Sequence, residues 1–246
     1  MGIENRDDVT ATYVLIHGAG ADSWCWHRVR PLLEAAGHTV ITPDLPVSDD
    51  TAGLPEYVDT VRRAVGSREH VTVVAHSFGG FVGPIAAEQL GADLLVLLHA
   101  MIPKPGEAPG QWWSATGHEQ ARRRDDELHG PAAGDVEFWA HDTPPVLAAE
   151  AMRRGIPQSV TPFTEPWPMD HWPQTPTRVL LSRGDRFLPA EFLETVTTDR
   201  LGIAADTMPG DHLPMLGHPE CLVERLETYR RAPGVVPRLT FPTVHR

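Results

Sequence analysis

The segment Val71–Gly80 constrains this chain more than any other, because it combines a strand, a serine on a tight turn and the start of a helix. Five residues of strand character precede the pentapeptide Ala75-His76-Ser77-Phe78-Gly79, and a helix-compatible run follows from Phe78 to Leu90. The residues at 75 and 79 need to be small, since such a turn leaves no room beside the serine. The turn strains the backbone of Ser77 and lifts its hydroxyl clear of the sheet.

Short apolar runs alternate with amphipathic stretches along most of the chain, which is typical of a parallel sheet with crossover helices. Several of these runs are continuously apolar, as expected for strands that are covered on both faces. The predicted strands are Thr12–Ile16, Thr39–Thr42, Val71–Ala75, Leu94–Leu98, Arg178–Ser182 and Ala204–Met208. The predicted helices are Trp24–Ala36, Pro55–Val65, Phe78–Gln89, Pro189–Arg200 and Pro219–Arg231. This order predicts an α/β fold with a mostly parallel sheet flanked by helices.

Residues 102–175 interrupt the alternation, because they contain many prolines and no clear strand. A structureless loop of this length is uncommon in a compact domain, so we expect helices within it, at Glu119–Leu128, Val136–Ala140 and Pro145–Arg154. We predict one domain over residues 1–246, with a core at about 9–101 and 176–231, a helical lid at about 102–175 and a C-terminal tail at 232–246. The tail is rich in proline and apolar residues, and either packing onto the domain or self-association as a homodimer fits it.

Composition excludes several classes of partner. The formal net charge of −12 argues against nucleic acid, whose phosphates need a basic face. No stretch reaches the 18 or more apolar residues that span a bilayer, so we expect no membrane insertion. Met1–Asp8 is polar and lacks the apolar core of a signal peptide, which predicts a cytoplasmic protein. Cys25 and Cys221 could pair, but two reduced thiols in a reducing compartment is the simpler interpretation.

Ser77 needs a base and an acid to become nucleophilic, and both should lie in loops at the carboxyl ends of strands. The loop after Arg178–Ser182 places Asp185 just beyond the strand, and the loop after Ala204–Met208 places His212 in the same way. Asp185 could instead pair with a neighbouring arginine. We therefore predict a catalytic triad of Ser77, Asp185 and His212, in this chain order.

Other residues near these loops receive structural predictions. His218 competes with His212 but is better placed to cap the last helix, and Asp211 is expected to be a solvated loop acid. His17 and His76 fit roles in holding the motifs in place better than proton transfer.

The negative charge that develops on a carbonyl oxygen during acyl transfer needs hydrogen-bond donors, and backbone amides usually supply them. One donor should be the amide of Phe78, directly after the nucleophile. The second should come from the loop after the first strand, His17-Gly18-Ala19-Gly20, in which Ala19 is the natural candidate. These two amides are the predicted oxyanion hole.

Taken together, these residues resemble the α/β-hydrolase superfamily, and within it the small esterases related to plant methylesterases and hydroxynitrile lyases. The resemblance covers both sides of the predicted lid and is weak within it. It rests on His17-Gly18-Ala19-Gly20, Trp24-Cys25-Trp26, Pro31–His38, Pro43-Asp44-Leu45, the serine turn, Asp185 with Phe187-Leu188-Pro189, and His212–Leu216. It implies an α/β-hydrolase fold with a helical lid and a serine mechanism that uses no cofactor and no metal.

Two positions depart from the lyase branch of this family. That branch carries threonine after the first-strand histidine, where this chain has Gly18, and lysine after the catalytic histidine, where it has Leu213. The only lysine is Lys104, far away in sequence. Cyanohydrin cleavage is therefore disfavoured, and a dehalogenase, which needs an aspartate nucleophile, is excluded by Ser77.

The lid is expected to shape the substrate site. Its tryptophans could form an aromatic wall over Ser77, and we predict contacts to substrate from Trp112, Trp113, Trp139 and Leu213, although Trp112, Trp113, Trp139, Trp167 and Trp172 could equally be lid core. The histidines of the lid (His118, His129, His141 and His171) lack metal-ligand spacing, so no metal site is predicted.

We predict hydrolysis of an ester or thioester of a small, largely apolar substrate through an acyl-enzyme. Two alternatives stay open. The same triad could carry out acyl transfer, cyclisation or carbon–carbon bond cleavage in biosynthesis, or the chain could bind a small molecule with little turnover.

Overall fold

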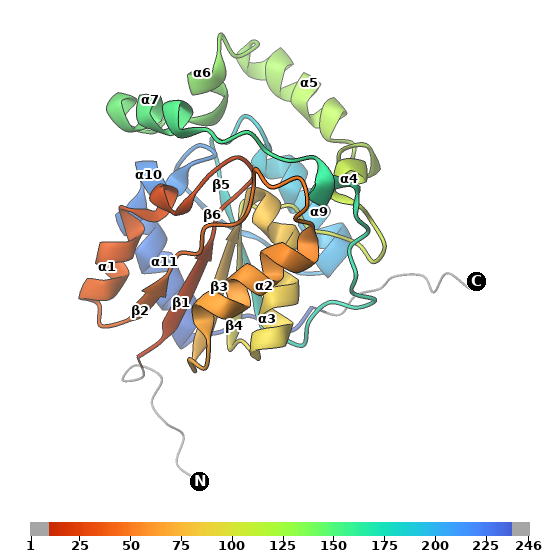
Figure 1. Cartoon of the computed structure of the whole chain (residues 1–246). Coiled ribbons are helices and arrows are strands. Elements are labelled where there is room, and N and C mark those ends of the chain that lie inside the picture. Colours follow the sequence, from red (N-terminus) through yellow and green to blue (C-terminus); the bar gives the residue numbers. More distant parts are fainter. Residues whose placement is uncertain (1–9, 238–246) are drawn as a thin grey trace.

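Six parallel strands form the centre of the molecule, in the order β2-β1-β3-β4-β5-β6 (Figure 1). The structure is a computed structural model that describes residues 10–237. The strands are β1 (Thr12–Ile16), β2 (Thr39–Ile41), β3 (Val71–His76), β4 (Leu94–Leu98), β5 (Thr177–Ser182) and β6 (Asp206–Met208). All six lie where the sequence predicts them, with ends that differ by at most two residues. Each parallel pair needs a crossover, and the helices supply it.

Helices cover both faces of the sheet, and alternate residues of each strand point to opposite sides. Val14 and Ile16 of β1 join the apolar cluster under α2 (Leu54–Val65), α3 (Gly83–Leu90) and α9 (Ala190–Leu201). Tyr13 and Leu15 join the second cluster, under α1 (Val29–Ala35) and α11 (Pro219–Arg231). The continuously apolar strands of the sequence are therefore explained by burial on two sides.

Two predicted helices are each divided, and a proline explains both divisions. The predicted Trp24–Ala36 consists of a 3₁₀ turn, η1 (Ser23–Trp26), followed by α1, which contains Pro31. The predicted Phe78–Gln89 consists of η2 (Ser77–Phe81) and α3, which contains Pro84. Proline has no amide hydrogen and its ring clashes with the carbonyl four residues earlier, so an α-helix cannot continue back across that point.

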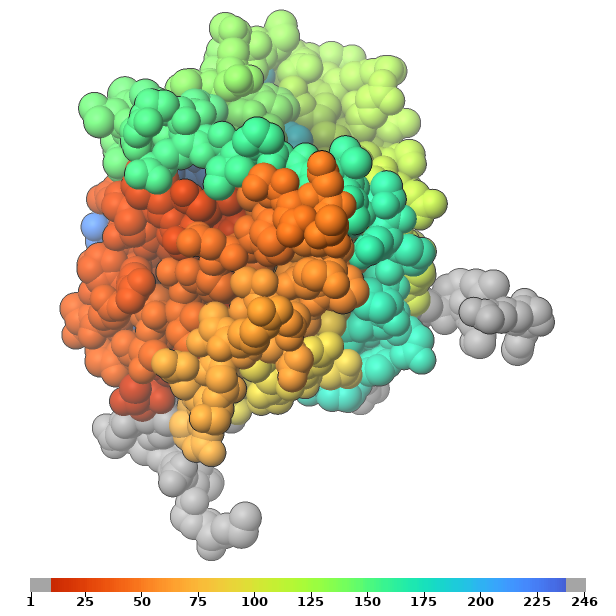
Figure 2. All heavy atoms as spheres, viewed as in Figure 1, coloured from red at the N-terminus to blue at the C-terminus, as the bar shows by residue number. Residues whose placement is uncertain are grey.

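The segment between β4 and β5, here called the insertion (residues 99–176), lies over the end of the sheet. Figure 1 shows α5, α6 and α7 above the strands, and Figure 2 shows the green segment that includes α7 over the red and orange N-terminal part of the core. Its helices are α4 (Pro109–Thr116), α5 (His118–His129), α6 (Asp135–Trp139), α7 (Pro145–Arg154) and α8 (Thr161–Thr164). The prediction found α5, α6 and α7 and missed α4 and α8. It also missed the short α10 (Pro214–Gly217) in the core.

The beginning of the predicted tail packs on the core. Val235 forms an antiparallel bridge with Thr177, and the Arg178 guanidinium donates to the carbonyl of Ala232. The predictions for Met1–Asp8 and for the rest of the tail, residues 238–246, lie outside the described residues. Between residues 10 and 237, no helix has the length and apolar character needed to cross a membrane.

Candidate active site

Ser77 occupies a strained turn between β3 and η2. Its φ of 55° lies in the left-handed region, which a non-glycine residue adopts only when its surroundings impose it. Close packing on both sides imposes it here. A Cβ on Gly79 would lie 3.1 Å from the carbonyl of His17, and one on Gly83 would lie 2.5 Å from the Ala75 methyl group. The small residues that the sequence requires at 75 and 79 are therefore explained by packing.

The structure brings the three predicted triad residues into one hydrogen-bonded chain. His212 Nδ1 lies 2.5 Å from Asp185 Oδ2, and His212 Nε2 lies 3.1 Å from Ser77 Oγ. A carboxylate only accepts, so Nδ1 carries the proton and Nε2 presents its lone pair to the serine hydroxyl. All three side chains are buried. This is the arrangement that a base-activated serine requires.

The carboxylate of Asp185 accepts hydrogen bonds on both oxygens and does not pair with Arg183 or Arg186. Oδ1 accepts from the amides of Phe187, at 2.7 Å, and Leu188, at 3.0 Å. Oδ2 accepts from His212, and His99 Nε2 lies 2.8 Å from the same oxygen. Burial opposes ionisation of this group, yet its pKa lies well below the ordinary value because His212 and His99 attract the carboxylate and donate to it. Asp185 therefore stays charged.

His99 is a member of the site that the sequence analysis missed. It follows β4 directly, has a φ of 46° and is fully buried. Its Nδ1 accepts from the amide of Ser182 at 2.7 Å, so Nε2 carries the proton. Nε2 donates to the carbonyl of Leu188 at 2.6 Å and also lies 2.8 Å from Asp185 Oδ2. A polar residue directly after the fully apolar strand Leu94–Leu98 was the signal that could have identified it.

His17 and His76 hold the backbone around the site. His76 Nε2 donates to the carbonyl of His212 at 2.8 Å, and burial lowers the pKa of His76 well below its ordinary value, which keeps the ring neutral. His17 Nδ1 donates to the carbonyl of Gly18, while its Nε2 accepts from the amide of Leu45. These contacts match the structural role expected for both residues.

The two predicted oxyanion donors flank Ser77. Phe78 is the second residue of η2, and the first amides of a helix have no partner within it. Ala19 lies in the loop after β1 and lines the same cavity as Ser77. Gly18 lets this loop approach, because a Cβ there would lie 2.9 Å from the Cβ of Ser77. A threonine at this position, as in the lyases, would require the serine turn to shift.

The loop after β1, Ser77 and the insertion enclose a cavity of about 280 Å³. Trp113, Trp139 and Leu213 line it, as predicted for substrate contacts. The walls of the cavity are mostly apolar. The residues that line it are Gly18, Ala19, Gly20, Ala21, Asp22, Trp24, Cys25, His76, Ser77, Phe78, Met101, Trp113, Trp139, Ala151, Met152, Arg154, Gly155, Phe163, Phe187, His212, Leu213 and Leu216. A space of this size and character suits a small, largely apolar molecule.

Trp112 is a correction to the predicted substrate contacts. It is fully buried, packs in the core against Phe192 and donates through Nε1 to the carbonyl of Ile102 at 3.0 Å. Neighbouring residues of a helix point in directions about 100° apart, so Trp113 faces the cavity while Trp112 faces the sheet. Trp167 and Trp172 are also buried in the core and do not line the cavity.

Asp211 is a second correction, because it is buried and not solvated. Its carboxylate accepts from the amide of Asp142 at 2.8 Å and from the hydroxyl of Thr143 at 3.0 Å, and so joins the insertion to the loop of His212. His218 precedes α11 as predicted, but its side chain makes no cap and instead contacts Asp142 at 2.8 Å.

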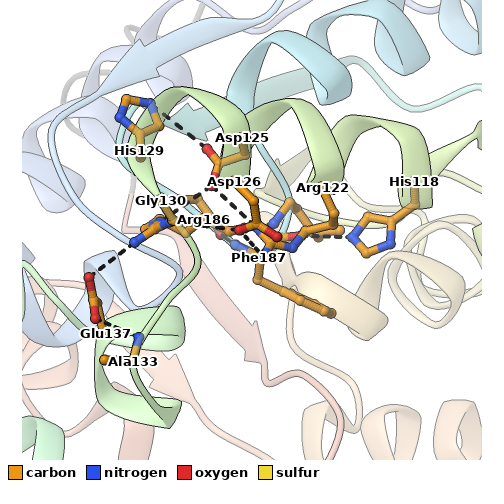
Figure 3. A network of polar contacts seen from close by, with 12 residues as sticks. His118, Arg122, Asp125, Asp126, His129, Gly130, Ala133, Glu137, Arg186 and Phe187 are labelled. Carbon is orange, nitrogen blue, oxygen red and sulfur yellow. Dashed lines mark hydrogen bonds and ion pairs between the residues drawn. The ribbon is translucent and has the colours of Figure 1, made fainter.

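The insertion also contacts the loop of Asp185, mainly through Arg186 (Figure 3). This guanidinium bridges Asp125 of α5, at 3.3 Å, and Glu137 of α6, at 3.2 Å. Figure 3 also shows Arg122 donating to the carbonyl of Arg186, and His118 donating to that of Phe187 at 2.7 Å. We call these contacts the Arg186 network. They fix the insertion beside the triad acid.

Among the described residues, one group has side chains of a metal-binding type in close proximity, namely His99, Asp185 and His212. His212 Nδ1 and His99 Nε2, both protonated, lie 2.5 and 2.8 Å from the same carboxylate oxygen. These are hydrogen-bond distances that leave no common position for an ion between the three groups. Cys25 and Cys221 are free thiols, and Cys25 lies in the cavity wall.

Comparison with known proteins supports the fold described above. The sequence pattern of the alpha/beta hydrolase family matches residues 13–225, which is most of the chain. Norfluorocurarine synthase 1 of Strychnos nux-vomica is 34% identical over 114 residues, covering 42% of this chain and 43% of that protein. Methylesterase 1 of Arabidopsis thaliana is 36% identical over 110 residues, covering 39% and 42%. The chain thus matches less than half the length of these curated relatives.

A solved structure extends the likeness of the fold to almost the whole chain. A pyrethroid hydrolase from Sphingobium faniae JZ-2 superimposes with a TM-score of 0.72 and covers 92% of this chain and 99% of its own, at 23% identity. At that identity the likeness concerns the fold alone. With the family match, the class of the protein follows: the chain belongs to the alpha/beta hydrolase family, a family of enzymes whose members include the methylesterases that the sequence resembles.

Proposed function

We propose that this protein is a serine hydrolase that cleaves an ester or thioester of a small, largely apolar substrate. The observation that carries the proposal is the chain of contacts from Ser77 to His212 to Asp185 at the wall of an apolar cavity. A serine whose hydroxyl faces the lone pair of an oriented histidine is equipped to attack a carbonyl carbon.

The mechanism follows from these positions. His212 Nε2 takes the proton of Ser77 as the serine oxygen bonds to the carbonyl carbon, while the amides of Ala19 and Phe78 stabilise the oxyanion. His212 then protonates the leaving alcohol or thiol, and an acyl-enzyme results. Water, activated by the same histidine, attacks the acyl-enzyme and releases the acid. Asp185 fixes the tautomer of His212 and stabilises its charged form, and His99 holds Asp185. In this mechanism the insertion acts as a lid.

The first test is release of p-nitrophenol from short-chain p-nitrophenyl esters by the wild type and by Ser77→Ala. We expect turnover by the wild type and a loss of at least about 1000-fold in the variant, because the nucleophile is removed. Circular dichroism of both proteins serves as the folding control. A folded wild type without turnover, or a Ser77→Ala variant of equal activity, would contradict the proposal.

A biosynthetic reaction without net hydrolysis is the second candidate, and the similarity to norfluorocurarine synthase 1 favours it. The same nucleophile, base and oxyanion donors would then serve acyl transfer, cyclisation or carbon–carbon bond cleavage. A protein that binds a small molecule with little turnover is a third possibility. A wild type that is stabilised against heat by an apolar ester but leaves it uncleaved would favour that third reading.

A further inference from the structure

The chain that leaves α7 runs beside the loop of Ala19 and bonds to it from two positions. The carbonyl of Gly20 accepts from the amide of Ile156 at 2.8 Å, and the amide of Gly20 donates to Gln158 Oε1 at 3.0 Å. Gly20 has a φ of 64°, and a Cβ there would lie 3.1 Å from the carbonyl of Ile156. Both backbone groups of the residue next to Ala19 are therefore held by the insertion.

The side-chain amide of Gln158 has a single orientation that satisfies its neighbours. Its nitrogen faces the carbonyls of Ser159, at 3.0 Å, and Val47, at 3.3 Å, and the hydroxyl of Tyr57, at 3.0 Å. Carbonyls only accept and the Gly20 amide only donates, so a flipped amide would oppose like groups on both sides. The oxygen that receives the Gly20 amide is thus fixed in place.

Tyr57 connects Gln158 to the other side of the oxyanion site. This residue of α2 is fully buried, and its ring packs edge-to-face on Phe78 with 6.1 Å between centroids. Gln158 itself is half-buried, and it is not one of the described residues that line the cavity. Any effect of Gln158 on catalysis has to pass through Gly20 and Tyr57, since it does not touch the substrate space.

We infer that Gln158 is a positioning residue, which fixes the amide of Gly20 and so directs the neighbouring amide of Ala19 at the oxyanion. The inference rests on the proposed serine hydrolysis. It is physically reasonable because an oxyanion donor must lie within about 2.7–3.1 Å of the oxygen. A displacement of about 1 Å can cost about 100-fold in rate.

The decisive experiment compares Gln158→Leu with the wild type on p-nitrophenyl butyrate, with active sites titrated by a fluorophosphonate. We expect kcat to fall about 10- to 100-fold and KM to change less than about 3-fold, since the donor acts in the transition state. Inhibition by phenylboronic acid, whose adduct with serine is tetrahedral, should weaken by a similar factor. If Gln158→Leu only disturbed packing, a smaller fraction of the protein would react with the fluorophosphonate, and kcat per titrated site would be unchanged.

Gln111→Leu is the matched control. Gln111 Oε1 accepts from the amide of Ala108 at 3.0 Å, which is the same kind of bond in the same insertion, away from the oxyanion loop. The kcat of Gln111→Leu per titrated site should stay within about 2-fold of the wild-type value. Gln158→Glu keeps an acceptor for Gly20 but loses the donors to Val47 and Ser159, so its kcat should lie between those of Gln158→Leu and the wild type.

Two results would overturn the inference while the proposed function stands. The first is a Gln158→Leu variant with unchanged kcat and unchanged boronate affinity. The second is an equal loss of kcat in Gln158→Leu and Gln158→Glu, which would show that the Gly20 contact is not what matters. Failure of the proposed function has a different signature, because the wild type would then show no hydrolysis that depends on Ser77, and the inference would fall with it.

Discussion

The core and the insertion are stabilised by different interactions. Every residue of β1, β3 and β4 is buried, and these strands lie between two apolar clusters. By contrast, α5 and α6 have no buried residue, and the Arg186 network holds them to the loop of Asp185. Apolar burial fixes Ser77, Asp185 and His212 in one position, while α5 and α6 are held by polar contacts and by aromatic packing such as that of Trp139 on Phe187. The proposed reaction thus relies on groups held by the core, and the insertion covers the cavity in which they lie.

The largest expected effect separates two acids that lie near His212. In Asp185→Asn the amide cannot stabilise the charged histidine and favours the wrong tautomer, so kcat/KM for p-nitrophenyl esters should fall about 1000- to 10,000-fold. Asp211→Asn is the matched control, because Asp211 binds the insertion through Thr143 and Asp142 and not the ring of His212. It should lose at most about 10-fold. Equal losses in the two variants would show that the insertion matters as much as the triad acid.

The second prediction compares two glycines. A Cβ on Gly80, in the core, would lie 1.8 Å from the carbonyl oxygen of Met101, whereas Gly134, in the insertion, has an extended φ of 173° and no heavy atom within 4 Å of that position. Gly80→Ala should lower the free energy of unfolding by about 3–5 kcal/mol or prevent folding. Gly134→Ala should change it by less than about 0.5 kcal/mol. Urea denaturation followed by tryptophan fluorescence measures both, and a tolerated Gly80→Ala would contradict this packing.

The third prediction concerns the attachment of the insertion. Arg186→Met removes a buried guanidinium from Asp125 and Glu137, which should cost about 2 kcal/mol because the largely buried Asp125 loses a charged donor. Limited proteolysis should then cleave faster between residues 118 and 140. The exposed Arg153, which pairs with Glu150 inside α7, is the control, and Arg153→Met should leave the cleavage rate unchanged. An unaltered pattern in Arg186→Met would show that other contacts hold the insertion.

The smallest effect is a dependence of stability on pH. Burial lowers the pKa of His17, His76 and His118 below the ordinary value. Below pH about 6.5 the unfolded chain binds protons that the folded chain does not, so stability falls as the pH decreases. Between pH 7.5 and 5.5 we expect a loss of about 1–2 kcal/mol.

Urea midpoints at these two pH values test this, and the interval from pH 7.5 to 8.5, where these groups are neutral in both states, serves as the control. The ionised Asp185 does not mask the effect, since its stabilising contribution is lost only at much lower pH, below the value of about 3.9 at which the unfolded group titrates. A stability that rises towards pH 5.5 would contradict the sign.

Sequence patterns predicted the sheet well because each strand carries its own signal. Leu94–Leu98 is apolar throughout, as expected for a strand covered on both sides. Pro31 and Pro84 were visible as well, but the predicted helices ran across them, and only the structure shows the breaks that they cause. The insertion was predicted less completely, because α4 and α8 are short, contain proline in the first turn, and owe their form to contacts distant in sequence.

The candidate site divides in the same way. Ser77, Asp185 and His212 could be identified because each follows a strand in a parallel sheet, where loops converge at one edge. The position of His99 after β4 was a signal that the sequence analysis overlooked, but nothing local marks Asp185 as its neighbour. Gln158 has no local signal at all. Trp112 and Trp113 were indistinguishable in the sequence, and only the rotation of α4 decides which of them faces the cavity.

By itself the sequence determined the order of strands and helices, the strained turn at Ser77 and the three groups that meet there, because backbone preferences and hydrophobic periodicity act over a few residues. The tertiary structure decided which side chains reach across the molecule: His99 to Asp185, Asp211 to Thr143, Gln158 to Gly20. The members of each pair are at least 68 residues apart in the sequence, and their contact depends on how the layers pack. Hydrogen bonds between distant residues form only once burial has brought them within about 3 Å of each other.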